Sequence, residues 1–194
     1  KFYAEYDTNM KDLRSAAGKL SGTDFQLDKS DIRANADGSK SYSDRLKNAI
    51  SNVKDLVNEY NETSDFLREN KSLGKGVQQL TTEFSDTTYK ADSYAKMGIT
   101  VDAKTGKMSV NESRLARALT DSPAQSEAIL GKGGLAGRAD RHAQYAQMSR
   151  SRVIPSMEQA IGSQLNYAAN MLNGRSLPTM QRYSNILNLF SIYV

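Results

Sequence analysis

The sequence has no cysteine and no tryptophan, and it contains a single histidine and three prolines. Without cysteine the chain forms no disulfide bond and no thiolate metal site, and nucleophilic thiol chemistry is excluded. One histidine leaves few options for acid–base catalysis. Asp and Glu are so numerous that some neighbouring carboxylates are inevitable, and their presence alone does not indicate an active site. We therefore expect no enzyme activity, no cofactor and no metal site.

Apolar residues are scarce as well. Hydrophobic residues make up 38% of the 194-residue chain and aromatic residues 8%, and the mean hydropathy is −0.62. No stretch approaches the ~18 consecutive apolar residues of a transmembrane helix, and residues 1–7 contain no apolar signal-peptide core. A thick globular core needs more apolar surface, whereas elongated helical architectures tolerate this composition. We predict a mainly α protein, an elongated helical bundle or coiled-coil stalk with one small β-hairpin.

Three segments carry apolar residues at alternating steps of three and four, the spacing of coiled-coil packing. Residues 1–42 are predicted to form an N-terminal helix and a polar connector, in which Asp24–Lys40 is a loop or one short strand. Residues 43–130 are predicted to form a helical stalk, with a second helix from Ser43 to about Asn70 and a long antiparallel third helix after a glycine-containing turn. The three patterns are Tyr3, Tyr6, Met10, Leu13, Ala17 and Leu20; Leu46, Ile50, Val53, Val57, Tyr60, Ser64 and Leu67; and Val77, Leu80, Phe84, Thr87, Ala91 and Tyr94.

A short β-hairpin is predicted over residues 99–110. Gly98 ends the third helix, and Gly106 supplies the turn because it adopts positive φ without strain. A helix follows at once, with Asn111 as its N-cap. The apolar residues that alternate with polar ones in the two strands are Ile99, Val101, Met108 and Val110.

Residues 131–194 are predicted to form C-terminal helices. Ahead of them, Ser122 and Gln125 form a predicted capping box, with Pro123 in the first turn of a short helix. The glycines at 131, 133 and 134 predict a flexible joint, and they lack the spacing of a P-loop or a dinucleotide-binding motif.

A weakly apolar helical pattern begins at Leu135 and is predicted to need a partner surface, until Pro155 interrupts it. His142 lies among alanines in this pattern. It has no Ser or Asp beside it to form a relay and no second metal ligand at i+4, so we interpret it as a packing or surface residue.

The segment Leu177–Val194 is the most apolar of the chain, with large side chains again at steps of three and four. Such a stripe either docks in the core of its own domain or contacts another subunit. The candidate subunit-interface residues at the two ends of the chain are Tyr3, Tyr6, Met10, Leu13, Tyr183, Leu187, Phe190 and Tyr193.

The net charge of +4 is unevenly distributed. Residues 97–194 carry 11 Lys and Arg against 6 Asp and Glu, so the second half is basic. Its arginines are scattered along helical patterns and are not clustered with aromatic residues, and we therefore do not expect nucleic-acid binding. One function compatible with this charge is that of a secreted helical module that docks an acidic partner through its basic half, weakened by salt.

The run MGITVDAKTGKMSVNESRLARAL, followed by a Pro-started helix and then GLAGRAD, resembles the C-terminal part of the flagellar hook-associated protein 2 family, the filament cap. Upstream, VKDLVNEYNETSDFL is similar to a family segment of Val-x-x-Phe-Val-x-x-Tyr-Asn type, ahead of the pair Tyr60 and Asn61. The resemblance covers about residues 43–140. Members of the family usually carry large β-rich domains between the halves of a helical stalk, and Asp24–Lys40 is far too short to hold them.

The resemblance implies a structural, self-assembling protein of the bacterial flagellum. Such a protein crosses a narrow export channel unfolded, without a cleaved signal peptide, and assembles outside the cell as a homo-oligomer at the end of the filament. Its implied partners are other axial proteins, namely flagellin and the hook-junction proteins. A marginal core without cysteine suits this route, and subunit contacts would come from the helical ends of the chain.

Overall fold

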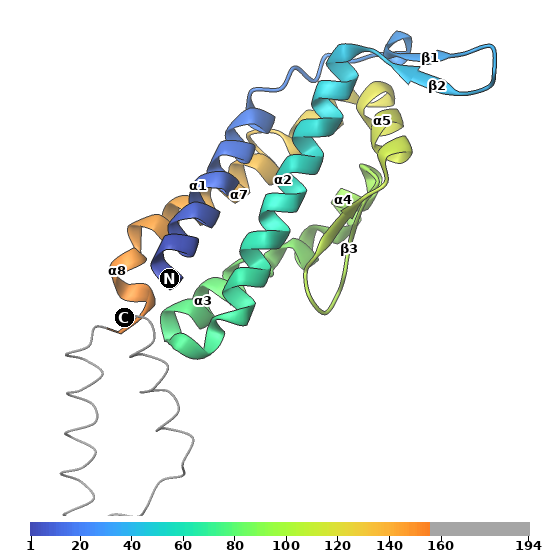
Figure 1. The fold of residues 1–194 in the computed structure, drawn as a ribbon. Coiled ribbons are helices and arrows are strands. Elements are labelled where there is room, and N and C mark those ends of the chain that lie inside the picture. The colour runs from blue at the N-terminus through green and yellow to red at the C-terminus, as the bar shows by residue number, and fades with distance from the viewer. Residues whose placement is uncertain (156–194) are drawn as a thin grey trace, which may run out of the picture.

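The computed structural model describes residues 1–155 and shows an elongated helical molecule (Figure 1). Helix α2 runs along most of the length of the molecule, and α1 lies beside it. A small hairpin, β1–β2, lies at the end far from the N-terminus. The predicted mainly α architecture is therefore confirmed. The elements in chain order are α1 (Phe2–Ser21), η1 (Lys29–Asp31), β1 (Ile32–Ala34), β2 (Lys40–Tyr42), α2 (Asp44–Glu69), η2 (Lys71–Leu73), α3 (Lys75–Glu83), η3 (Asp86–Lys90), α4 (Ala91–Lys96), β3 (Ile99–Val101), β4 (Met108–Val110), α5 (Glu112–Asp121), α6 (Pro123–Leu130), α7 (Leu135–Met148) and α8 (Arg150–Val153).

The first two predicted helices, α1 and α2, are both present. The second begins at Asp44, next to the predicted start at Ser43, and the Ser43 side chain caps it by accepting a hydrogen bond from the backbone N–H of Leu46. Every position of the second apolar pattern is buried, and so is every position of the first except Tyr3, which is partly exposed. The apolar periodicity thus identified the faces that pack in the core.

Helix α1 packs between α2 and α7 and runs antiparallel to both. Phe2 at its start stacks on Phe66 near the end of α2, with 5.2 Å between the ring centroids. After Leu135, the buried face of α7 consists of alanines, which let the two helix backbones approach closely. The partner surface predicted for this weakly apolar helix is therefore α1 of the same chain. The buried residues of α7 are Leu135, Ala136, Ala139, Ala143 and Ala146.

The prediction of one long third helix from the Val77–Tyr94 pattern is wrong. The chain forms α3, then a 3-10 turn at η3, then the short α4. Between them, the hydroxyl of Ser85 donates to the carbonyl of Thr82 (2.7 Å) and that of Thr87 donates to the carbonyl of Gly106 (2.8 Å). Short polar side chains that bond to backbone compete with helix continuation, and this tertiary contact keeps the segment out of one straight helix.

The described residues contain two β-hairpins where the sequence predicted one. The additional hairpin, β1–β2, pairs Ile32 with Tyr42 inside the connector that was expected to be a loop or a single strand. The buried carboxylate of Asp31 anchors it, accepting hydrogen bonds from Ser43 Oγ (2.5 Å) and from Arg45 Nη2 (3.1 Å). The Ser43 bond is the main cause of the lowered pKa of Asp31, so the carboxylate stays charged at this anchor.

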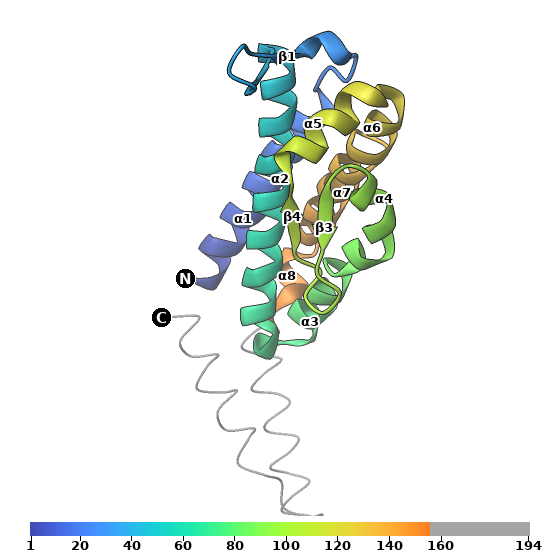
Figure 2. The ribbon, with the colours of Figure 1, turned by 90° about the vertical axis from the view of Figure 1, so that its right-hand side faces the viewer.

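The predicted hairpin is confirmed as β3–β4, in which Ile99 pairs with Val110. Gly98 and Gly106 adopt φ values of +73° and +71°, as the two turns require. Asn111 then caps α5, since its side chain accepts from the N–H of Arg114 at 3.0 Å. Figure 2 shows the hairpin lying along α2.

The predicted capping box at Ser122 does not form. Ser122 makes no side-chain cap bond, although Pro123 does occupy the first turn of α6. Instead, the hydroxyl of Ser126 donates to the Ala118 and Ser122 carbonyls, both at 3.0 Å, which links α5 to α6. In the glycine joint that follows, a Cβ on Gly134 would lie 2.0 Å from the carbonyl oxygen of Ile129, so this position admits no larger residue without a shift of the backbone.

Candidate interaction surfaces

Four of the predicted interface residues lie on α1, and the structure places three of them inside the chain's own core. Tyr6, Met10 and Leu13 have 0% exposed surface, and the Tyr6 hydroxyl donates to the Ala146 carbonyl at 2.6 Å. Burial is the main cause of the raised pKa of Tyr6, which keeps its hydroxyl protonated as a donor. Their burial within residues 1–155 is complete without a second copy. No finding tests a subunit contact through them, which stays a prediction.

Tyr3 is the partly exposed member of this group. The guanidinium carbon of Arg150 lies 4.4 Å from the centre of its ring, and Arg150 also pairs with Asp7 through two hydrogen bonds of 2.6 and 2.8 Å. A bidentate pair combined with a cation–π contact fixes the start of α8 against the first two turns of α1. The other candidates, Tyr183, Leu187, Phe190 and Tyr193, lie outside the described residues.

A polar junction joins α2, η3 and α7 around the carboxylate of Asp86. Its Oδ2 lies 3.0 Å from both Arg138 Nη1 and His142 Nε2, and its Oδ1 accepts from the Tyr60 hydroxyl at 3.2 Å. Desolvation acts to raise the pKa of Asp86, but the His142 hydrogen bond and the His142 and Arg138 charges outweigh it, so the pKa is lowered. Burial, followed by the Asp86 charge, raises the pKa of Tyr60 well above its ordinary value.

This junction was missed in the sequence. His142 was predicted to be a packing or surface residue, and its ring does pack on that of Phe84, with 5.3 Å between the ring centroids. Its acidic partner, however, lies 56 positions away. The spacing of Arg138 and His142, four apart on one helix face, is the one local signal, and it is too common to identify an acidic partner.

The pair Tyr60 and Asn61 ties α2 to its neighbours in two directions. Tyr60 reaches Asp86, while Asn61 both donates to and accepts from the backbone of Met108, at 2.8 and 2.9 Å. The Asn61 amide therefore satisfies the free edge of strand β4 as a neighbouring strand would. Farther along α2, Arg68 donates to the Thr105 carbonyl at 2.7 Å, which holds the tip of the same hairpin.

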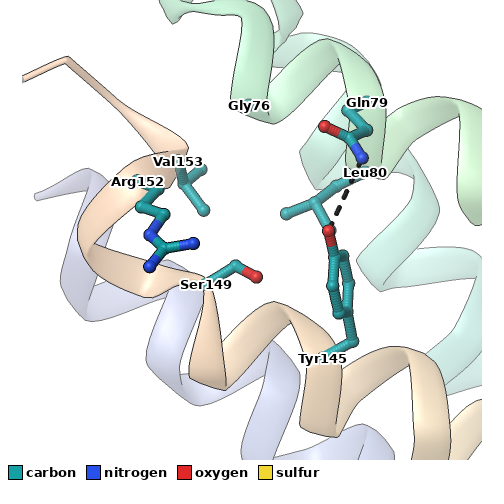
Figure 3. Close-up of a pocket in the computed structure, with 7 residues that line it drawn as sticks. All are labelled: Gly76, Gln79, Leu80, Tyr145, Ser149, Arg152 and Val153. Carbon is teal, nitrogen blue, oxygen red and sulfur yellow. Dashed lines mark hydrogen bonds between the residues drawn. The ribbon is translucent and has the colours of Figure 1, made fainter.

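A surface groove of about 190 Å³ lies between α3 and the α7–α8 junction (Figure 3). Leu80 and Val153 form its apolar part, and the Gln79 amide donates across it to the Tyr145 hydroxyl at 3.5 Å. The complete lining is Gly76, Gln79, Leu80, Tyr145, Ser149, Arg152 and Val153. Its lining contains no Asp, Glu, His or Cys side chain.

The described part of the chain contains no group of three or more His, Cys, Asp or Glu residues placed to hold a metal ion. None of its helices is long and apolar enough to cross a membrane.

Comparison with known protein families gives one match, to the C-terminal part of flagellar hook-associated protein 2, over residues 66–188. The comparisons with curated proteins and with solved structures found no match. The matched region begins near the end of α2 and includes the β3–β4 hairpin, the groove, and Asp86 with its partners Arg138 and His142. Proteins of the flagellar hook-associated protein 2 family are structural and associated with the filament. The match gives no support to the alternative function, a binding module for acidic partners. Because the match covers more than half of the sequence, the chain belongs to the flagellar hook-associated protein 2 family.

Proposed function

We propose that this protein is a self-assembling subunit of the flagellar filament cap, which forms homo-oligomers through the helical ends of its chain. The observation that carries the proposal is the family match over residues 66–188. In the same proposal the chain is exported without a cleaved signal peptide and contacts flagellin and the hook-junction proteins outside the cell.

The two ends of the described part, together with the apolar stripe that follows it in the sequence, support this assembly mode. The start of α1 and the end of α8 meet at one end of the elongated molecule, tied by Arg150 and Asp7 (Figure 1). Residues 156–194 follow in the sequence. They include the Leu177–Val194 segment, whose apolar stripe needs a covering surface. The proposal assigns a second copy of the chain as the partner that covers this stripe.

The test compares the mass of the full chain with that of two variants by light scattering. The wild type is expected to be oligomeric, and a variant with Tyr183, Leu187, Phe190 and Tyr193 changed to alanine is expected to lose mass. The matched control changes the intervening polar residues Gln181, Asn185, Asn188 and Ser191 to alanine and should leave the mass unchanged. Equal masses for all three proteins would contradict assembly through this segment.

A further inference from the structure

The groove between α3 and α7–α8 belongs to a larger exposed surface with positive charge and apolar side chains. Arg141, Tyr145, Met148 and Arg152 are spaced by four, three and four residues along α7 and α8, and all are exposed. Tyr145 and Met148 are large hydrophobic side chains with 44% and 79% of their surface exposed. Lys75 at the start of α3 adds a third cation. These five residues are called the basic face.

None of the three cations of the basic face pairs with an acid among residues 1–155, although most other arginines of this region do. Glu83, at the end of α3, is the acid on the same helix as Lys75, and it is also without an ion pair in that range. The basic face therefore has a surplus of positive charge beside exposed apolar surface. A complementary partner would present carboxylates around a modest apolar contact.

Carboxylates without a cationic partner gather on another side of the same molecule. Asp12 of α1 and Asp55, Glu59 and Glu62 of α2 form an acidic face, and none of the four pairs with a cation among the described residues. Burial raises the pKa of Glu59, and the nearby charges of Glu62, Asp12 and Asp55 raise it further, against a weaker opposing effect of Lys19. Like charges so close to one another destabilise the isolated chain, and a cationic partner would relieve that repulsion.

The order of the helices places the two faces apart. Helix α1 packs on α2 and on α7, while α3 packs on α2 and on α8, so these elements form a closed circuit around the core. The acidic face lies where α1 meets α2, and the basic face lies where α3 meets α7 and α8. Figure 3 agrees, since α1 lies behind α7 and α8 when the molecule is viewed from the groove.

We propose that the basic face of one copy docks on the acidic face of the next copy, so that subunits join head to tail. This inference rests on the proposed self-assembly and specifies a contact for it. Two different surfaces on opposite sides make a heterologous contact, which each further copy can repeat. A contact of this kind builds a ring when its rotation closes and a helical array when it does not, and both suit the end of a filament better than a two-fold dimer does.

Charge reversal in the full chain tests this contact. The first variant combines Arg141→Glu with Arg152→Glu, and the second combines Glu59→Lys with Glu62→Lys. The third carries all four changes. The control, Arg114→Glu with Arg117→Glu, changes the net charge as much as the first variant does, at exposed positions of α5 without an ion pair in the described range. Circular dichroism verifies that each variant is folded.

Association is measured by sedimentation at about 50 mM and about 500 mM salt, since screening weakens contacts between exposed charges. Each single-face variant should associate at least about tenfold more weakly than the wild type at low salt, because like charges then face each other. The four-change variant, and an equal mixture of the two single-face variants, should recover most of the association. The control should behave as the wild type.

The outcomes separate this contact from the proposed function. Wild-type association in both single-face variants, or no recovery in the four-change variant, would overturn the head-to-tail contact. If the wild type still assembles in that case and loses mass when the stripe of residues 177–194 is changed, self-assembly stands without this contact. A wild type that is monomeric at every concentration would overturn both.

Discussion

Thr63 is a core residue whose side chain lowers the stability of the fold. Its side chain is fully buried in α2, and its hydroxyl is the one buried side-chain polar atom of residues 1–155 that has no hydrogen-bond partner. A buried hydroxyl without a partner costs about 1–3 kcal/mol, because it has lost its bonds to water and gained none in the protein.

Thr63→Val should therefore raise the free energy of unfolding by about 1 kcal/mol, because it keeps the shape and removes the unpaired group. Urea denaturation measures the change. The control is Thr120→Val, at a buried threonine whose hydroxyl donates to the Ala116 carbonyl at 3.0 Å. The control should be no more stable than the wild type, and a Thr63→Val variant that is less stable than the wild type would contradict the argument.

Asp86 is the residue whose charge joins three separate elements. Its lowered pKa means that the unfolded chain binds a proton more readily at this group than the folded chain does. The stability that the group contributes is thus fully present above its unfolded pKa, and it is lost as the pH falls through its folded pKa.

Asp86→Asn should lower the free energy of unfolding by about 2 kcal/mol at neutral pH, because Arg138 and His142 lose a charged acceptor in a partly buried site. Urea denaturation at pH 7 and pH 3 should show a smaller difference from the wild type at pH 3. Asp121→Asn is the control, since its ion pair with Lys29 spans 3.8 Å at an exposed site and should matter little at either pH. A difference that is equal at both pH values would contradict the role of the charge.

Two glycines show how the packing between elements decides what a residue type is for. A Cβ on Gly76 would lie 2.6 Å from the Val153 carbonyl oxygen, so α3 approaches α8 closely only because this side chain is missing. A Cβ on Gly18 in α1 would meet nothing within 4 Å. Glycine at position 76 therefore permits the contact between α3 and α8, whereas glycine at position 18 only lowers the stability of α1.

Gly76→Ala should lower the free energy of unfolding by about 1–3 kcal/mol, because α8 must move away from α3. Gly18→Ala should raise it by about 0.5–1 kcal/mol, because alanine favours the helix and clashes with nothing. Thermal unfolding of the pair checks both signs. Two changes of the same sign would show that the α3–α8 approach is not what requires glycine at position 76.

At the scale of the whole molecule, a thin core serves an elongated shape. The described core is a continuous strip along α1, α2 and α7, with smaller contributions from the hairpin β3–β4 and the short helices. Such a molecule has long side surfaces and two ends, and our two proposals use them differently. The first proposal assigns an apolar contact to the helical ends of the chain, and the second assigns a charged head-to-tail contact to the sides of the molecule.

The sequence predicted the local structure well where local rules decide it. The apolar periodicity of α1 and α2, the start of α2 near Ser43, the Asn111 cap and the Gly98 and Gly106 turns were all visible in it. These features depend on residues within a few positions of one another, so their physics is written in the neighbouring sequence. The family resemblance was readable for the same reason, since it consists of such motifs in order.

The tertiary structure alone decided the features that depend on distant residues. The apolar spacing from Val77 to Tyr94 indicated one helix. The structure has shorter helices there, because Thr87 contacts Gly106 and Asp86 pairs with residues of α7. The same holds for the partner of α7 and for the positions of the two charged faces. Sequence by itself determined which residues turn inward and where helices start, because those are properties of short segments. Which surfaces meet is set by packing between segments that are far apart in the chain, and only the folded molecule shows it.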